Sequence, residues 1–98
     1  MATFVTLVNL TEQGSKNFKA SPERGEKFAT EAKKAGVTVK EMVWTMGRYD
    51  VVMIMEGPDD EMVAGVLARL AALGNVKTQT MRGFTAAEMK EILSKMPG

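Results

Sequence analysis

The stretch "WTMGRYDVVMIMEGPDDE", residues 44–61, decides the fold. Gly47-Arg48 separates two predicted strands, and the second of these, residues 49–56, is apolar on both faces. A strand of this kind needs cover from two layers and belongs in the middle of a sheet. The stretch therefore predicts a β-hairpin whose second strand is central.

A two-residue turn with glycine first is typical of the type II′ hairpin, which sets the register of the two strands. One face then carries the pairs Trp44 with Val51, Met46 with Tyr49 and Met42 with Met53. The other face carries the pairs Thr45 with Asp50, Val43 with Val52 and Glu41 with Ile54. We expect the aliphatic second face to lie beneath helices. The methionine and aromatic face is expected to stay uncovered and to pair with a second copy, or else to be covered by the chain's own C-terminal helix.

Capping and turn residues divide the rest of the chain into strands and helices. Ser21-Pro22 predicts a helix start that runs to Gly36, Gly57-Pro58 predicts a second helix that ends at Gly74, and Thr85 with Glu88 forms a capping box for a third. Strands are predicted at residues 3–10, 37–46, 49–56 and 76–84, and a loop or weak helix at residues 11–20. The order is βαββαβ plus a C-terminal helix, which predicts an α+β, ferredoxin-like, four-stranded antiparallel sheet in one domain spanning residues 1–98.

The composition restricts the chemistry that is available to the protein. The chain has no Cys and no His, which removes thiolate nucleophiles, His-containing triads and the usual zinc ligands. The net charge of +1 gives no general reason to bind nucleic acid or an anionic membrane. We expect no metal, no cofactor and, because the N-terminus lacks the features of a signal peptide, a cytoplasmic location.

The chain resembles the GYD domain family, which is named for a Gly-x-Tyr-Asp stretch present here as Gly47, Tyr49 and Asp50. The resemblance extends over Thr11, Gly14, Ser21-Pro22, Arg24, Trp44-Thr45, Pro58-Asp59, Gly74-Asn75-Val76, Arg82, Phe84-Thr85 and Glu88. It implies a dimeric α+β barrel built from ferredoxin-like subunits. The hairpin is also similar to the effector-binding domain of Lrp/AsnC-type regulators, in which such a turn helps to form a pocket for an amino acid.

Six residues are candidates for binding a small ligand: Trp44, Thr45, Tyr49, Asp50, Arg24 and Arg82. Asp50 is either a carboxylate at the mouth of a pocket or a turn residue bonded to Thr45 or to backbone amides. Aromatic rings with a polar group suit a pocket or an interface. The two arginines either hold an anionic group or form ordinary surface contacts.

These features favour a stand-alone, non-catalytic module that binds or senses a small molecule and forms a homodimer or larger homo-oligomer through its sheet. The alternative is a small enzyme of the dimeric α+β barrel type, such as a cofactor-independent monooxygenase or an isomerase, with Asp50 or Tyr49 as its acid or base. A deep closed cavity in each protomer would favour the enzyme, and a shallow groove between subunits would favour sensing. A third possibility is a purely structural interaction protein.

Overall fold

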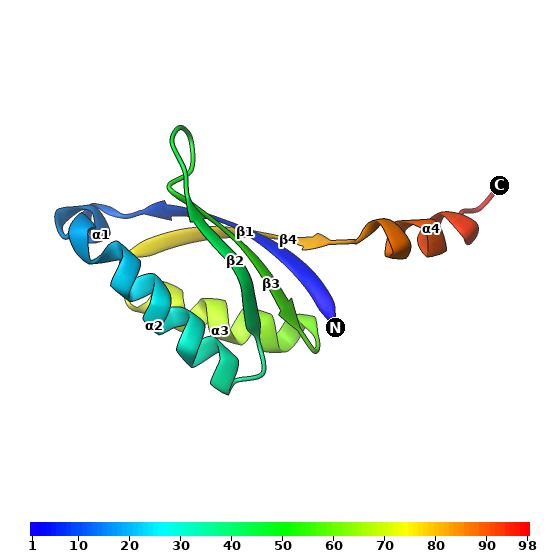
Figure 1. Ribbon diagram of the computed structural model, residues 1–98, viewed down its shortest axis with the longest axis horizontal. Helices are drawn as coiled ribbons and strands as arrows, with labels where there is room; N and C mark the ends of the chain where they lie inside the picture. Colours follow the sequence, from blue (N-terminus) through cyan, green and yellow to red (C-terminus); the bar gives the residue numbers. More distant parts are fainter.

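The computed structural model describes residues 1–98 and consists of a sheet with helices along one of its faces (Figure 1). The strands are β1 (Ala2–Leu10), β2 (Thr38–Trp44), β3 (Val51–Gly57) and β4 (Val76–Gly83). The helices are α1 (Glu12–Lys16), a short 3₁₀ turn (Phe18–Ala20), α2 (Ser21–Lys34), α3 (Asp60–Ala72) and α4 (Ala86–Ser94). The predicted ferredoxin-like α+β fold is confirmed, including the weak helix between β1 and α2.

The strand order is β2-β3-β1-β4, and every pairing is antiparallel. The two strands that are apolar on both faces, β1 and β3, are therefore the central ones. The hairpin predicted this for β3, and the ferredoxin-like order implies it for β1. The predicted hairpin register is also confirmed from Glu41 with Ile54 to Trp44 with Val51. A β-bulge between Val39 and Glu41 then shifts the start of β2 by one residue relative to β3.

The hairpin loop is longer than the predicted two-residue turn. The strand ladder ends at Trp44 with Val51, and the loop is closed by one more bond from the Thr45 N–H to the Asp50 carbonyl, at 2.9 Å. Gly47 has the positive φ that the turn prediction required, 110°. Since Met46 and Tyr49 do not pair, the alternation of faces stops at Trp44 and Val51.

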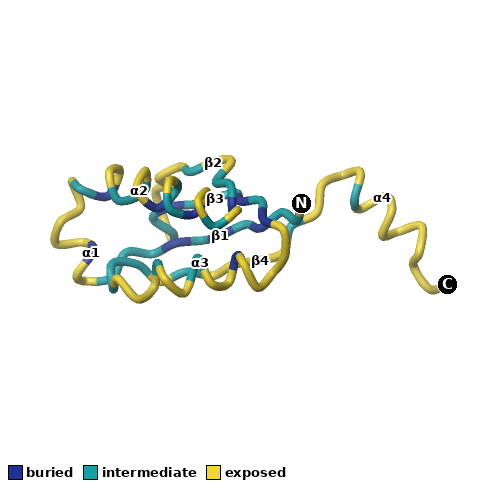
Figure 2. The backbone as a smooth tube through the Cα atoms, turned by 90° about the horizontal axis from the view of Figure 1, so that it is seen from below, coloured by how far each residue is buried: buried dark blue, intermediate teal, exposed yellow.

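Both long helices lie on the same face of the sheet, α2 alongside β2 and α3 alongside β4 (Figure 1). The residues coloured as buried lie mainly on the central strands and on the helices that face them (Figure 2). The core consists of Phe4, Val8, Phe28, Ala32, Val37, Val51, Met53, Met55 and Val63. Only 13 of the 98 residues are buried, so much apolar surface of the single chain stays in contact with solvent.

The predicted assignment of the two sheet faces is wrong. Met53 and Met55 are buried beneath the helices, and Met42 and Trp44 contact α2 at Gly25, whereas Val52 and Ile54 are only partly buried on the other side. Hairpin alternation shows which side chains share a face, but not which face receives the helices. Flexible methionines fill the irregular space under two helices, which explains their side of the sheet.

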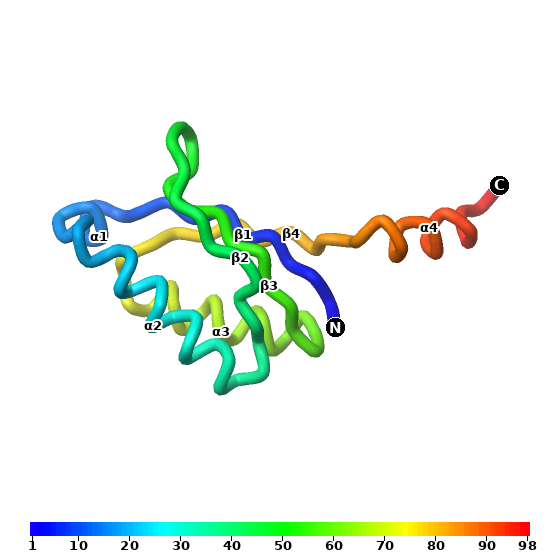
Figure 3. The backbone as a smooth tube through the Cα atoms, in the orientation of Figure 1, coloured from blue at the N-terminus to red at the C-terminus, as the bar shows by residue number.

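The opposite side of the sheet has no helix over it. We call its apolar centre the open face, which consists of Val5, Leu7, Val43, Val52, Ile54 and Met81. Polar residues surround it, among them Lys40 and Glu56, which form an ion pair at 3.7 Å. The chain's own C-terminal helix, which the sequence offered as a possible cover for an exposed sheet face, does not cover the open face. Helix α4 projects beyond the end of the sheet instead (Figure 3).

Helix starts follow the sequence with one exception. The predicted capping box at Thr85 and Glu88 is present, and the hydrogen bond from the Thr85 N–H holds the pKa of the Glu88 carboxyl below its usual value. Asp59 caps α3 by accepting a hydrogen bond from the Met62 N–H. The exception is Ser21, which is the first residue of α2 and not its cap. Its buried hydroxyl accepts the indole N–H of Trp44 at 3.0 Å.

Helix α1 is fixed to the turn between α3 and β4 through Thr11 and Gly14. The Thr11 N–H donates to the Asn75 carbonyl at 3.0 Å, and the Thr11 hydroxyl donates to the Gly74 carbonyl at 2.6 Å. Gly14 lies directly against the same turn, because a Cβ atom at this position would be 2.1 Å from the Asn75 carbonyl oxygen. The backbone of Asn75 cannot yield as a flexible side chain would.

Gly14→Ala is therefore expected to lower the free energy of unfolding by about 1–3 kcal/mol through overpacking. Gly65→Ala is the matched control, because Gly65 also lies in a helix and a Cβ there has no neighbour within 4 Å. The control should be stabilising by roughly 0.5–1 kcal/mol through helix propensity. Urea denaturation measures both effects, and equal stability of Gly14→Ala and wild type would contradict the close contact.

Candidate functional site

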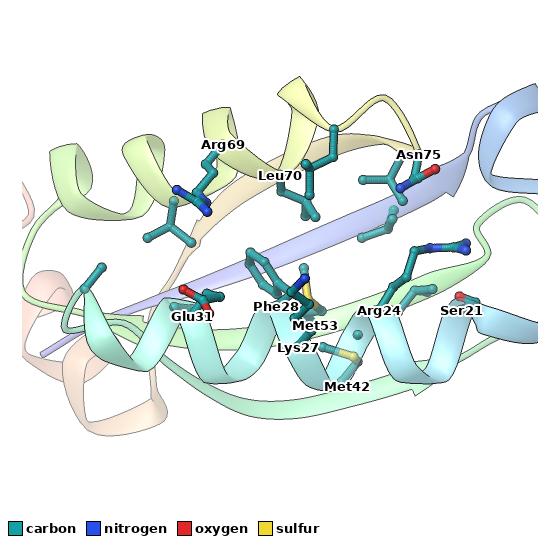
Figure 4. A pocket seen from close by; sticks show the side chains of 18 of the residues that line it. Ser21, Arg24, Lys27, Phe28, Glu31, Met42, Met53, Arg69, Leu70 and Asn75 are labelled. Carbon is teal, nitrogen blue, oxygen red and sulfur yellow. The ribbon is translucent and has the colours of Figure 1, made fainter.

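A cleft of about 730 Å³ lies between α2 and α3, with the sheet as its floor (Figure 4). Side chains from the helices and from the central strands converge on it. Phe28 from α2, Leu70 from α3 and Met53 from β3 give the cleft an apolar interior. Such a space can take an organic molecule whose main contact is apolar.

Small residues explain why a cleft is present between the helices. Gly25 allows α2 to approach the sheet closely at β2, because a Cβ there would lie 2.7 Å from the Met42 sulfur and 3.1 Å from the Trp44 ring. On the facing side, Gly65 of α3 has nothing within 4 Å of the corresponding position. One helix is thus held against the edge of the sheet, and the other presents no side chain at Gly65 to fill the space between them.

The polar groups at the end of the cleft near α1 are already bonded within the chain. Ser21 accepts a hydrogen bond from Trp44, and the Asn75 amide oxygen accepts one from the Gln13 side chain at 2.9 Å. Arg24 donates to the carbonyls of Asn17 and Gly14, at 2.9 and 3.2 Å. These groups hold the end of the cleft near α1 in place, and they leave the apolar floor as its main binding surface.

Charged side chains lie along the rim of the cleft. Lys27, Lys34 and Glu31 belong to α2, whereas Glu61 and Arg69 belong to α3. Glu31 pairs with Lys34 at 3.5 Å. Figure 4 shows Arg69 extending from α3 towards α2. Together with Arg24, the rim carries more positive than negative groups, which favours a ligand with a negative charge.

The six residues predicted to bind a ligand do not form one site. Trp44 and Arg24 line the cleft, but Thr45, Tyr49, Asp50 and Arg82 do not. The Thr45 hydroxyl donates to the Tyr49 carbonyl within the hairpin loop, and the Tyr49 hydroxyl donates to Gln79 at 3.1 Å. Tyr49 borders a second, smaller hollow with Leu7, Asn9 and Lys77, on the side of the open face. Trp44 and Tyr49 are therefore on opposite sides of the sheet, and not on one face as predicted.

Arg82 lies near the opposite end of the sheet. It is four residues beyond Thr78 along β4, and Thr78 is in the same row of the sheet as Val8, Val51 and Trp44. This spacing corresponds to roughly 13 Å along the strand. The Arg82 guanidinium donates to the carbonyls of Thr3 and Gly83 and lies over the rings of Phe4 and Phe84.

Asp50 connects the hairpin to the end of β1. Its carboxylate accepts a hydrogen bond from the Leu10 N–H at 2.8 Å, and its own N–H donates to the Val8 carbonyl at 2.9 Å. The sequence offered Thr45 or backbone amides as partners, and the observed partner is a backbone amide of a different strand. Asp50 itself does not border the cleft, although both of its partners, Val8 and Leu10, line it. A role of Asp50 in ligand binding stays a prediction.

The sequence did not single out Phe28, Gly65, Leu70 and Arg69 as site residues. Phe28 and Leu70 are apolar residues within two of the predicted helices, which suits packing but does not show that the two helices leave a space between them. The available signal was the small size of the residues beside them, Ala32 and Ala35 on α2 and Gly65 on α3.

No group of three or more His, Cys, Asp or Glu side chains is placed to hold a metal ion. None of the helices has the length and apolar character needed to span a membrane.

Asp50→Ala is expected to lower the free energy of unfolding by about 1–3 kcal/mol, because it leaves the partly buried Leu10 N–H without its acceptor. Asp50→Asn should cost clearly less, since an amide oxygen can accept the same bond. Thermal and urea unfolding of both variants measure this difference. Wild-type stability of Asp50→Ala would contradict a structural role and favour a residue reserved for a ligand.

Comparison with known proteins agrees with the resemblance in the sequence. The family model described as the GYD domain matches residues 4–93. The chain is 33% identical over 90 residues to the "Glutamine synthetase and cystathionine beta-lyase binding protein" of Thermus thermophilus. The aligned residues are 91% of this chain and 95% of that protein. No solved structure matches the chain. The chain belongs to the GYD domain family.

Proposed function

We propose that this protein is a binding module that takes a small apolar organic acid in the cleft between α2 and α3 and assembles as a homo-oligomer through its open face. The observation that carries the proposal is the cleft itself. Its volume of about 730 Å³ lies in the range of small-molecule sites, and its lining is mainly apolar, with charges at the rim. The name of the Thermus relative, a binding protein, supports a binding role.

The lining of the cleft supports binding more than catalysis. Asp50 and Tyr49, the acid or base candidates of the alternative enzyme, do not border the cleft. Ser21 is bonded to Trp44, and Glu31 is paired with Lys34. The cleft lies within one chain, as an enzyme pocket would, but it is open between the two helices and does not enclose a reaction from water.

The open face supports assembly. It places six apolar side chains in the centre of an uncovered sheet, with Val43 and Met81 about half exposed, at 50% and 49%. Polar residues surround this centre, which is the arrangement found in protein interfaces. A second copy offers a matching surface, because a two-fold axis brings the same patch of both subunits together.

Binding of another protein is the second candidate function, and the name of the Thermus relative favours it. The same open face would then receive a different polypeptide. The oligomeric state separates the two candidates, since a face buried between copies is not free for another partner.

For ligand binding, Gly65→Phe is expected to fill the cleft without a clash, because nothing lies near a Cβ at this position. The probe is 1-anilinonaphthalene-8-sulfonate, an apolar molecule with one negative charge, titrated by fluorescence. Its dissociation constant should rise by about 10-fold or more, as expected when a contact of roughly 1.4 kcal/mol is lost.

Ala64→Phe is the matched control, because it adds the same side chain to α3 at an exposed position that does not border the cleft. Its dissociation constant should stay close to that of wild type. Equal probe binding by wild type and Gly65→Phe would exclude the cleft as the site.

For assembly, light scattering at micromolar concentration should give at least a dimer of the 10.7 kDa chain. Val43→Asp places a charge on the open face and should shift the protein towards monomer, because burying an unpaired charge is costly. Met46→Asp adds the same charge in the hairpin loop, where the side chain is 100% exposed, and should leave the assembly unchanged. A monomeric wild type would refute assembly through the open face and favour the second candidate.

A further inference from the structure

Helix α4 carries an apolar face that nothing in its own chain covers. The helix projects beyond the end of the sheet and makes no extensive contact with another element (Figures 1 and 3). Its apolar side chains follow the spacing of a single helix face. They are Met89, Ile92 and Leu93, with Met96 two residues beyond the end of the helix, and all of them are exposed.

The junction before α4 is short and bonded within the chain. Only Phe84 and Thr85 separate β4 from α4, and Thr85 is held in an extended conformation by the capping box. Arg82 fixes the end of the strand, since its guanidinium lies 5.5 Å from the centre of the Phe4 ring and 4.6 Å from that of Phe84. It also donates to the Thr3 carbonyl at 3.3 Å. These contacts direct α4 away from its own sheet (Figure 1).

A helix of this length is not stable without a surface to pack on. Isolated helices shorter than about 12–15 residues are marginal in water, and α4 has nine residues. The capping box and the ion pair between Glu91 and Lys95, at 3.3 Å, contribute little by comparison with the packing of an apolar face. A second polypeptide is therefore needed to complete α4.

We propose that α4 docks through its apolar face on a second copy of this chain, at the margin of the interface between the two open faces, and that the second copy returns its own α4 in the same way. The inference rests on the proposed assembly through the open face. In this arrangement α4 is a reciprocal arm, which extends the interface beyond the area that the two sheets alone can bury.

The size of the open face supports this arrangement. Four strands spaced about 4.8 Å apart and roughly 25 Å long give a flat footprint of about 480 Å². Two twisted sheets touch over only part of such an area. A stable interface buries about 800 Å² on each partner. An arm about 14 Å long and 10 Å wide has a footprint of roughly 140 Å². Each copy buries its own arm and also the surface that receives the other arm, which adds roughly 280 Å² per copy.

The charges on α4 also favour docking on a second copy of this chain over docking on an anionic membrane. Glu88 is engaged in the capping box and Glu91 is paired with Lys95, so Lys90 is the charged residue left over. This helix lacks the basic polar face that attracts anionic lipid. A second copy with a net charge of +1 presents no strong repulsion to it.

The test compares Leu93→Asp with Ser94→Asp by sedimentation equilibrium of the full chain. The two positions are adjacent and receive the same charge, but Leu93 is on the apolar face, 54% exposed, and Ser94 is on the opposite face. Because Leu93 packs on nothing within its own chain, its replacement should not unfold the subunit. Leu93→Asp should weaken association by about 10-fold or more, as loss of a buried anchor does, whereas Ser94→Asp should remain near wild type.

Hydrogen exchange gives a second readout, because amides of a docked α4 exchange slowly and those of an undocked nine-residue helix exchange fast. Protection of α4 in wild type and its loss in Leu93→Asp are expected. Wild-type association of Leu93→Asp, or equal weakening by both variants, would overturn the role of the arm.

The Val43→Asp variant separates failure of this inference from failure of the proposed assembly. If Val43→Asp dissociates the protein and Leu93→Asp does not, the sheet interface stands and the arm is refuted. If Leu93→Asp dissociates it and Val43→Asp does not, the open-face interface is refuted, and so is the arm as proposed, because its docking site was placed at the margin of that interface. A monomeric wild type refutes both.

Discussion

The structure depends on one constraint. The two central strands are apolar on both faces of the sheet, but the two long helices cover only one of these faces. β1 and β3 place Phe4, Val8, Val51, Met53 and Met55 beneath the helices, and these form most of the core. The same strands place Val5, Leu7, Val52 and Ile54 on the other side, where the chain supplies no cover. The helix face is left incompletely filled and the opposite face bare, and the cleft and the open face are the consequences.

The two proposed binding surfaces lie on opposite sides of one thin sheet. Val51 contributes to the cleft, and its neighbour Val52 belongs to the open face. A ligand in the cleft and a partner on the open face would therefore contact alternate residues of the same strands. Coupling between them would require only a small change in the twist or position of β3, without movement of a domain.

The sequence predicted what periodicity and local chemistry determine. The strand order followed from the apolar character of β1 and β3, the register followed from the hairpin, and the capping box at Thr85 followed from a short motif. It could not predict which face receives the helices, because Met53 and Val52 alternate in the same way whichever side is covered. That choice is set by the direction of the connections and by how well methionines fill the space under α2 and α3.

The candidate site was harder to predict than the fold. Tyr49 and Asp50 drew attention because they are polar and aromatic residues beside a turn, and the loop then proved too irregular for alternation to place them. Trp44 and Arg24 were recognised individually, but the cleft that they line is made by what is absent at Gly25 and Gly65. Small residues such as Gly65 are visible in a single sequence, but the space that they open appears only when two helices are placed beside each other.

The position of β1 in the sheet also has a consequence for how the chain folds. β1 is the first strand to be synthesised, yet its partners are β3 and β4, with Thr3 opposite Glu56 on one side and opposite Gly83 on the other. The hairpin of β2 and β3 is the only pair of neighbouring strands that is also close in sequence. During synthesis this hairpin can form early, while one edge of β1 waits for nearly the whole chain. Long-range pairing of this kind slows folding and leaves an apolar strand unprotected in the meantime.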